Sequence, residues 1–112
     1  MPKNLTYQQQ LARAMSEREL ARNVENLATA RGWKHYSVKD TVHPAIRTSR
    51  GFPDFLAIKG NRQIVAEFKR QGKDVTPEQL EWLDAFLQAG VEIFLWKPPD
   101  WLDGTIEREL SR

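Results

Sequence analysis

The fold is decided by the stretch DFLAIKGNRQIVAEFK, residues 54–69. Its two halves, 54–58 and 63–69, have the apolar and β-branched composition typical of strands. Between them, Gly60-Asn61 is a strong signal for a tight hairpin turn. The sequence therefore predicts two antiparallel strands, in which the start of the first lies against the end of the second.

Downstream of the hairpin, residues 76–79 (TPEQ) have the composition of a helix start: a Thr N-cap, Pro at the first helical position and Gln placed to complete a capping box. We expect this helix to run up to Gly90. Its predicted apolar side consists of Leu80, Leu83 and Leu87, with Trp82 and Phe86 beside them. The next run, Val91–Trp96, is almost wholly apolar, which predicts a strand buried on both faces and ended by Pro98-Pro99.

Upstream of the hairpin, Ser16 is a good N-cap and Gly32 a stop signal, so a helix is predicted over 16–31. On a helical wheel, Glu17 falls within about 80° of the apolar side chains Leu20, Val24, Leu27 and Ala28. Glu17 is therefore expected on the inward side. A strand is predicted over 33–38, and a polar connection with two arginines over 40–51.

The order of these elements predicts an α/β protein with a central mixed β-sheet flanked by helices, one on each side of the sheet. We expect residues 1–15 to form an N-terminal arm or short helix and residues 16–101 to form the domain. Residues 102–112 are expected to be a C-terminal tail with room for a short helix.

Bulk composition indicates one soluble globular domain. The chain has 112 residues, of which 40% are hydrophobic and 29% charged. It contains no cysteine, which excludes disulfides and thiolate metal sites. There is no apolar run long enough for a membrane span and no secretory-type leader, so a cytoplasmic location without membrane association is expected.

Charge is distributed unevenly along the chain. Residues 1–73 carry 14 Lys+Arg and 6 Asp+Glu, a net charge of +8, whereas residues 74–112 carry 3 and 9, a net charge of −6. A basic region of this kind favours a polyanionic partner such as nucleic acid. Solvated faces that vary in sign along the chain would produce the same pattern.

Three side chains that can carry chemistry are brought together by the predicted hairpin. Asp54 begins one strand, and Glu67 and Lys69, two residues apart near the end of the other, point to one face. Two carboxylates at one sheet end suit Mg²⁺, which prefers oxygen ligands and retains several waters. Such an ion activates a water for attack on a phosphoryl group, and Lys69 would orient the water or stabilise the developing charge. Glu17 could add a ligand or position a water.

The Glu-x-Lys triplet alone is weak evidence, because paired charges are common on exposed strand edges. However, Val65, Ala66 and Phe68 make the surrounding strand apolar, and charged residues in a buried strand are usually paired or functional.

Taken together, four stretches of the chain resemble the VRR-NUC family of the PD-(D/E)XK nuclease superfamily. They are residues 51–56 (GFPDFL), residues 66–69 (AEFK), the segment with Gly72, residues 76–79 and Trp82, and finally Gly90 with the strand VEIFLW. The likeness spans about residues 16–101. The stretch ERELA at 17–21 also resembles Holliday-junction resolvases.

The resemblance implies a restriction-endonuclease-like core and a metal-dependent site. It assigns Asp54 and Glu67 as metal-binding carboxylates, Lys69 as the catalytic lysine and Gln79 as the glutamine that opens the following helix. The leading-helix glutamate of the family corresponds to Glu17, with Glu19 as the alternative. Gln79 could equally serve only as a helix cap.

The remaining polar and aromatic candidates are less specific. Arg47, Arg50 and Lys73 are candidates for phosphate contacts, although surface solubility explains them almost as well. His35 and His43 are more typical of a packed strand residue and a surface loop residue than of ligands. We assign Trp33, Trp82 and Trp96 mainly to the core, and Trp101 to a possible subunit interface.

The function expected is Mg²⁺- or Mn²⁺-dependent hydrolysis of DNA. The resemblance implies structure-selective endonucleases that act on branched or flap DNA and that occur in phages and bacteria. A small stand-alone domain is expected to act as a homodimer, with two active sites across the substrate. Two alternatives remain: a sequence-specific nuclease of the restriction type, for which the chain has no obvious readout module, and a DNA-binding protein without catalysis.

Overall fold

The computed structural model describes residues 6–38 and 50–112. The elements in chain order are α1 (Tyr7–Ala14), α2 (Glu17–Ala30), β1 (Lys34–Ser37), β2 (Phe55–Lys59), β3 (Arg62–Phe68), α3 (Pro77–Gln88), β4 (Glu92–Trp96), α4 (Pro98–Leu102) and α5 (Thr105–Ser111). The predicted α/β class with a mixed sheet flanked by helices is confirmed. His43 and Arg47 lie outside the described residues.

The sheet has the strand order β1-β2-β3-β4. The β2–β3 hairpin is antiparallel as predicted, with Lys59 opposite Arg62 across Gly60-Asn61. Gly60 has a φ of 61° at the first turn position, which suits a two-residue hairpin turn. The long connection through α3 makes β4 parallel to β3.

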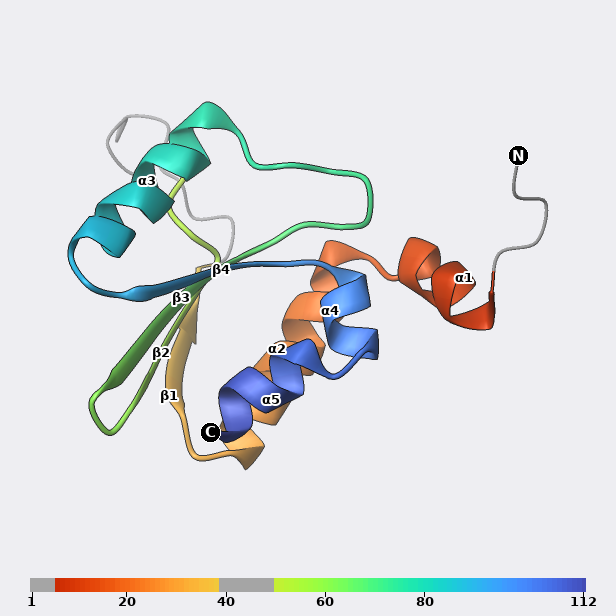
Figure 1. The fold of residues 1–112 in the computed structure, drawn as a ribbon, viewed down its shortest axis with the longest axis horizontal. Helices are drawn as coiled ribbons and strands as arrows, with labels where there is room; N and C mark the ends of the chain where they lie inside the picture. Colours follow the sequence, from red (N-terminus) through yellow and green to blue (C-terminus); the bar gives the residue numbers. More distant parts are fainter. Residues whose placement is uncertain (1–5, 39–49) are drawn as a thin grey trace.

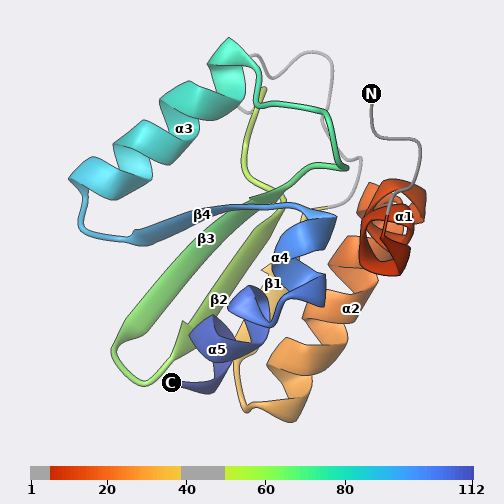
Figure 2. The ribbon, with the colours of Figure 1, turned by 45° about the vertical axis from the view of Figure 1, so that its right-hand side comes forward.

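Helices cover both faces of the sheet, as expected (Figures 1 and 2). One face of β3, with Ile64, Ala66 and Phe68, packs in a core with α2 and α5. The opposite face, which carries Val65 and Glu67, is turned toward α3. The end of β3 therefore has an α2 side and an α3 side, and both contribute to the site described below.

Two details of the predicted packing are wrong. The strand β4 is not buried on both faces, because it lies at the sheet edge with a single neighbour, and only Trp96 in it is buried. Helix α3 buries Leu83, whereas Leu80 and Leu87 are 56% and 52% exposed. On the helix, Leu80 and Leu87 are rotated from Leu83 by about 60° and 40° in the same direction, and this rotation carries them past the contact with the sheet.

The C-terminal residues 102–112 belong to the same hydrophobic core as the sheet. Ile106 and Leu110 of α5 are fully buried, and the Trp33 indole N–H donates to the Leu110 carbonyl at 2.8 Å. Trp33 and Trp96 are buried as expected, and Trp101 packs against this core.

The N-terminal segment contains a short helix, α1, one of the two forms expected for residues 1–15. Its N-cap Thr6 forms a capping box with Gln9, the same device that begins α2 and α3. None of the helices in the described ranges has both the length and the apolar character needed to span a bilayer.

Candidate active site at the end of the β2–β3 hairpin

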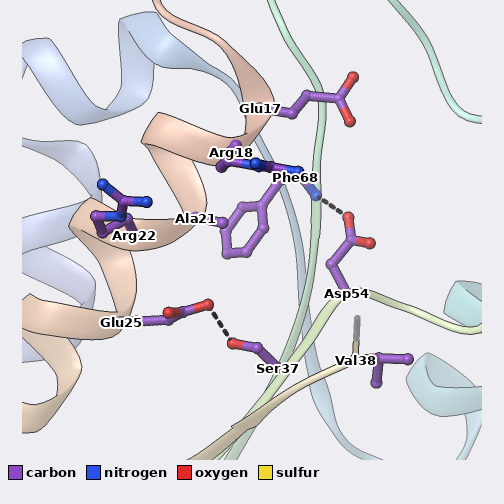
Figure 3. Close-up of a pocket in the computed structure, with 9 residues that line it drawn as sticks. All are labelled: Glu17, Arg18, Ala21, Arg22, Glu25, Ser37, Val38, Asp54 and Phe68. Atoms are coloured by element: carbon purple, nitrogen blue, oxygen red, sulfur yellow. Dashed lines mark hydrogen bonds between the residues drawn. The ribbon is translucent and has the colours of Figure 1, made fainter. Parts of the chain in front are cut away.

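The hairpin brings Asp54 and Glu67 together. The register pairs Phe55 with Ala66, so the residues one step beyond, Asp54 and Glu67, lie opposite each other on the same face. An Asp54 carboxylate oxygen accepts a hydrogen bond from the Phe68 backbone N–H at 2.9 Å, which holds the carboxylate at the end of β3 (Figure 3).

Glu67 is buried beside this carboxylate, with only 2% of its surface exposed. Its Oε2 accepts a hydrogen bond from the Gln79 side-chain amide at 2.9 Å and lies 3.9 Å from the Lys69 Nζ. Its other oxygen, Oε1, is buried without a hydrogen-bond partner among the residues described. The prediction that Glu67 and Lys69 share a face with Asp54 is confirmed.

The two carboxyl groups have raised pKa values. Burial raises the pKa of Asp54, and the hydrogen bond from the Phe68 N–H opposes this effect. Burial, together with the neighbouring Asp54 charge, raises the pKa of Glu67 to about 9, although the Lys69 ammonium opposes it. The pair therefore lacks sufficient positive charge for both carboxyl groups to ionise easily.

The donor set fits a hard divalent cation. Mg²⁺ is commonly held by one or two carboxylates, with water and substrate phosphate completing its shell. Asp54 and Glu67 supply two such carboxylates, and no hydrogen-bond donor of the described residues occupies the Glu67 Oε1, which could therefore face an ion. Within residues 6–38 and 50–112, no group of three or more His, Cys, Asp or Glu side chains is clustered for metal binding.

Glu17 nevertheless lies near the pair. Its Oε2 is 3.4 Å from the Arg70 backbone N–H, and its negative charge contributes to the raised pKa values of Asp54 and Glu67. The expectation that Glu17 lies on the inward, apolar side is wrong: Leu20 and Val24 are fully buried, but Glu17 is exposed because it is the first residue of α2.

Glu19, the alternative to Glu17, has a different role. Its carboxylate accepts the Ser16 backbone N–H at 3.0 Å, and this hydrogen bond lowers the pKa of Glu19. Glu19 therefore caps α2, and Glu17 is the helix glutamate at the site.

Helix α3 positions the site from the other side. Gln79 has two contacts: its Oε1 accepts the Thr76 N–H at 2.9 Å, while its amide donates to Glu67. The capping role and the site contact, which the sequence left as alternatives, thus occur together in one side chain.

The segment before Asp54 is attached to α3, a feature that the sequence analysis missed. The Trp82 indole N–H donates to the Arg50 carbonyl at 3.1 Å, and Phe52 packs edge-on against the Trp82 ring. Trp82 is only half-buried, because its partner is this segment rather than the sheet core. At Gly51, φ is 81° and an added Cβ would lie 2.6 Å from the Glu78 carbonyl carbon. Gly51, quoted above only as part of a motif, was the available signal for this close approach.

The predicted DNA-contacting residues are placed as follows. Arg50 is exposed at the start of the segment that leads to Asp54, and Lys73 is exposed between β3 and α3. His35 lies away from the site, where its ring nitrogen is 2.8 Å from the Thr29 hydroxyl and its ring packs near Phe55, so it is a packed residue as expected.

A groove of about 330 Å³ opens from Asp54 toward α2. Its lining includes two arginines, Arg18 and Arg22, that the sequence analysis did not single out. The signal available was their spacing of four residues, which places them on one side of a helix.

No family model, curated protein or solved structure matches this chain.

Proposed function

We propose that the protein is a Mg²⁺- or Mn²⁺-dependent endodeoxyribonuclease with a restriction-endonuclease-like core. The observation that carries this proposal is the buried carboxylate pair, Asp54 and Glu67, in which one Glu67 oxygen has no hydrogen-bond partner within residues 6–38 and 50–112 and the Lys69 ammonium lies 3.9 Å from the other. A purely structural carboxylate would be expected to have both oxygens satisfied. A carboxylate pair with raised pKa values beside a lysine is typical of a functional site.

When bound, the divalent ion would neutralise phosphate charge and lower the pKa of a water. Asp54 and Glu67 would hold the ion. The ammonium of Lys69, whose side chain is mostly buried, would orient the attacking water or stabilise negative charge that develops on the phosphoryl oxygens. Gln79 would act as a positioning residue, because its amide holds one Glu67 oxygen and leaves the other free for the ion.

Structure-selective cleavage of branched or flap DNA is the substrate class we propose, and the resemblance stated above supports it. We further propose a homodimer, which would place two sites across a branched substrate. Leu80 and Leu87 of α3 and Ile58 of β2 are more than half exposed, which would be consistent with burial of apolar surface between copies.

The proposal is tested with purified protein on labelled single-stranded, duplex, flap and four-way-junction DNA, with Mg²⁺, Mn²⁺ or chelator. Cleavage is expected with either metal and not with chelator. Lys69→Ala and Asp54→Asn are expected to abolish cleavage while DNA binding persists, because the asparagine amide oxygen can still accept the Phe68 N–H. Lys34→Ala serves as the matched loss of an exposed lysine outside the site, at the start of β1. Metal-independent cutting, or DNA binding without cutting under all conditions, would refute the nuclease assignment.

A further inference from the structure

A groove beside the candidate active site is lined by Asp54 and by further polar residues that the proposed chemistry does not use. It lies between α2 and the ends of β1 and β2, and it reaches Asp54 (Figure 3). The α2 side consists of Glu17, Arg18, Ala21, Arg22 and Glu25, and the opposite side of Ser37, Val38, Asp54 and Phe68. The four residues at 18, 21, 22 and 25 form one stripe of the helix.

The two arginines of this stripe are available to a ligand. Both Arg18 and Arg22 are exposed, and neither makes a hydrogen bond or ion pair with any residue that the structure describes. The charge of Arg22 acts on Glu19 only weakly, as the smallest of the influences on the pKa of that carboxyl group. The two arginines are separated by four residues, or about 6 Å along the helix axis. This spacing is comparable with that of consecutive phosphates along a nucleic-acid strand.

The acidic residues of the groove, in contrast, already have partners. The Ser37 hydroxyl donates to a Glu25 carboxylate oxygen, and the Glu17 carboxylate is near the Arg70 N–H. The Asp54 carboxylate accepts from the Phe68 N–H. The groove therefore offers a ligand two guanidinium groups that have no partner in the described part of the chain, and its carboxylates accept hydrogen bonds from the protein.

We infer that this groove binds an unpaired DNA strand, with Arg18 and Arg22 on consecutive phosphates next to the phosphate that the divalent ion would hold at Asp54. The inference rests on the proposed function for the position of the reacting phosphate. Guanidinium groups bind phosphate oxygens in bidentate geometry. A space of about 330 Å³ takes roughly one nucleotide, so the neighbouring phosphates would lie over the exposed arginines along α2, whereas a duplex is too wide to enter the space. The groove thus selects a single-stranded segment that flanks the cleavage position.

The inference is tested by DNA binding, which does not require cleavage. The Lys69→Ala protein, with and without the double change Arg18→Ala/Arg22→Ala, is titrated with fluorescent blunt duplex and with duplex that carries a single-stranded overhang. The affinity for each DNA is measured by fluorescence anisotropy in Mg²⁺ over a range of salt concentrations. The control double variant, Lys34→Ala/Arg108→Ala, removes the same charge from exposed positions outside the groove, and circular dichroism checks that each protein is folded.

Loss of two contacts to a single strand should reduce the slope of log K against log salt by about 1.4 on the overhang substrate. The slope on blunt duplex should not change, and the control variant should leave both slopes unchanged. An equal effect of the groove and control variants, or an equal slope change on blunt duplex, would overturn the inference. If the groove variant weakens binding only to the overhang substrate and the wild type never cuts DNA, the groove assignment stands and the nuclease assignment is refuted. The two proposals therefore fail separately.

Discussion

Glu67 is the only charged side chain fully buried in the described part of the chain. Its burial beside Asp54 costs folding free energy whenever its carboxyl group is ionised, because the folded environment favours the protonated form. A raised folded-state pKa means that the native protein binds more protons than the unfolded chain. The stability of the metal-free protein therefore has a defined pH dependence.

We predict that the metal-free protein loses stability as pH rises from about 4.5, the ordinary value for this carboxyl group, through the folded pKa of about 9. Below both values the group is protonated in the folded and unfolded states, so no penalty arises. The free energy of unfolding is measured by urea titration in chelator at pH 5, 7 and 9. Glu67→Gln keeps the shape of the side chain and should flatten the decline. Mg²⁺ should stabilise the wild type more at pH 9 than at pH 5, because it binds the ionised pair. An identical pH profile for wild type and variant would contradict the prediction.

At the scale of elements, α3 acts as the support for both carboxylates. Gln79 holds Glu67, and the backbone carbonyl of Arg50 and the ring of Phe52 attach the segment before Asp54 to Trp82. Because Gly51 has no side chain, this segment can lie against the first turn of α3. A change at Gly51 should therefore disturb the position of Asp54 without touching a site residue.

Gly51→Ala is expected to lower the unfolding free energy by about 2–4 kcal/mol, the sum of a positive-φ penalty and a clash with the α3 backbone. Gly72→Ala is the matched control, because φ there is 90° but no atom lies within 4 Å of an added Cβ. It should cost only about 1–2 kcal/mol. Chemical denaturation measures both values, and cleavage by the Gly51 variant should fall more than its folded fraction. Equal losses in the two variants would show that the close approach to α3 is not constraining.

In the whole molecule, the acidic and basic residues of the two parts of the chain pair with each other at one end of the sheet but not at the other. At the hairpin-turn end, acidic C-terminal residues form ion pairs: Glu92 with Arg62 at 2.9 Å and with Arg112 at 3.0 Å. At the opposite end of β3, beside Asp54, Arg18 and Arg22 make no ion pair with any described residue. The basic character inferred from residues 1–73 therefore remains available on the site side.

Arg62 also holds the C-terminal residues against the hairpin, through the Glu109 carboxylate at 3.6 Å and the carbonyls of Glu109 and Arg112, and α5 completes the core. Ile106→Ala should lower the unfolding free energy by about 2–5 kcal/mol, because a fully buried side chain leaves a cavity. Leu87→Ala removes a similar side chain that is 52% exposed, and it should cost less than about 1 kcal/mol. Urea unfolding compares the two. If both variants lost the same small amount of stability, residues 102–112 would be a tail rather than part of the core.

Local chemistry in the sequence determined the hairpin, the cap at Thr76 and the common face of Glu67 and Lys69, because turn residues, capping side chains and strand alternation act over a few positions. Tertiary structure decided the features that depend on contacts between distant elements. It placed β4 at an edge, turned Leu80 and Leu87 outward and made α5 part of the core. It also placed Glu17 near Asp54 and Arg70, which a helical wheel could not do, whereas the capping box between Ser16 and Glu19 is local. The groove with Arg18 and Arg22 exists only because α2 lies beside Asp54 and the ends of β1 and β2, and Asp54 is distant from α2 in the chain.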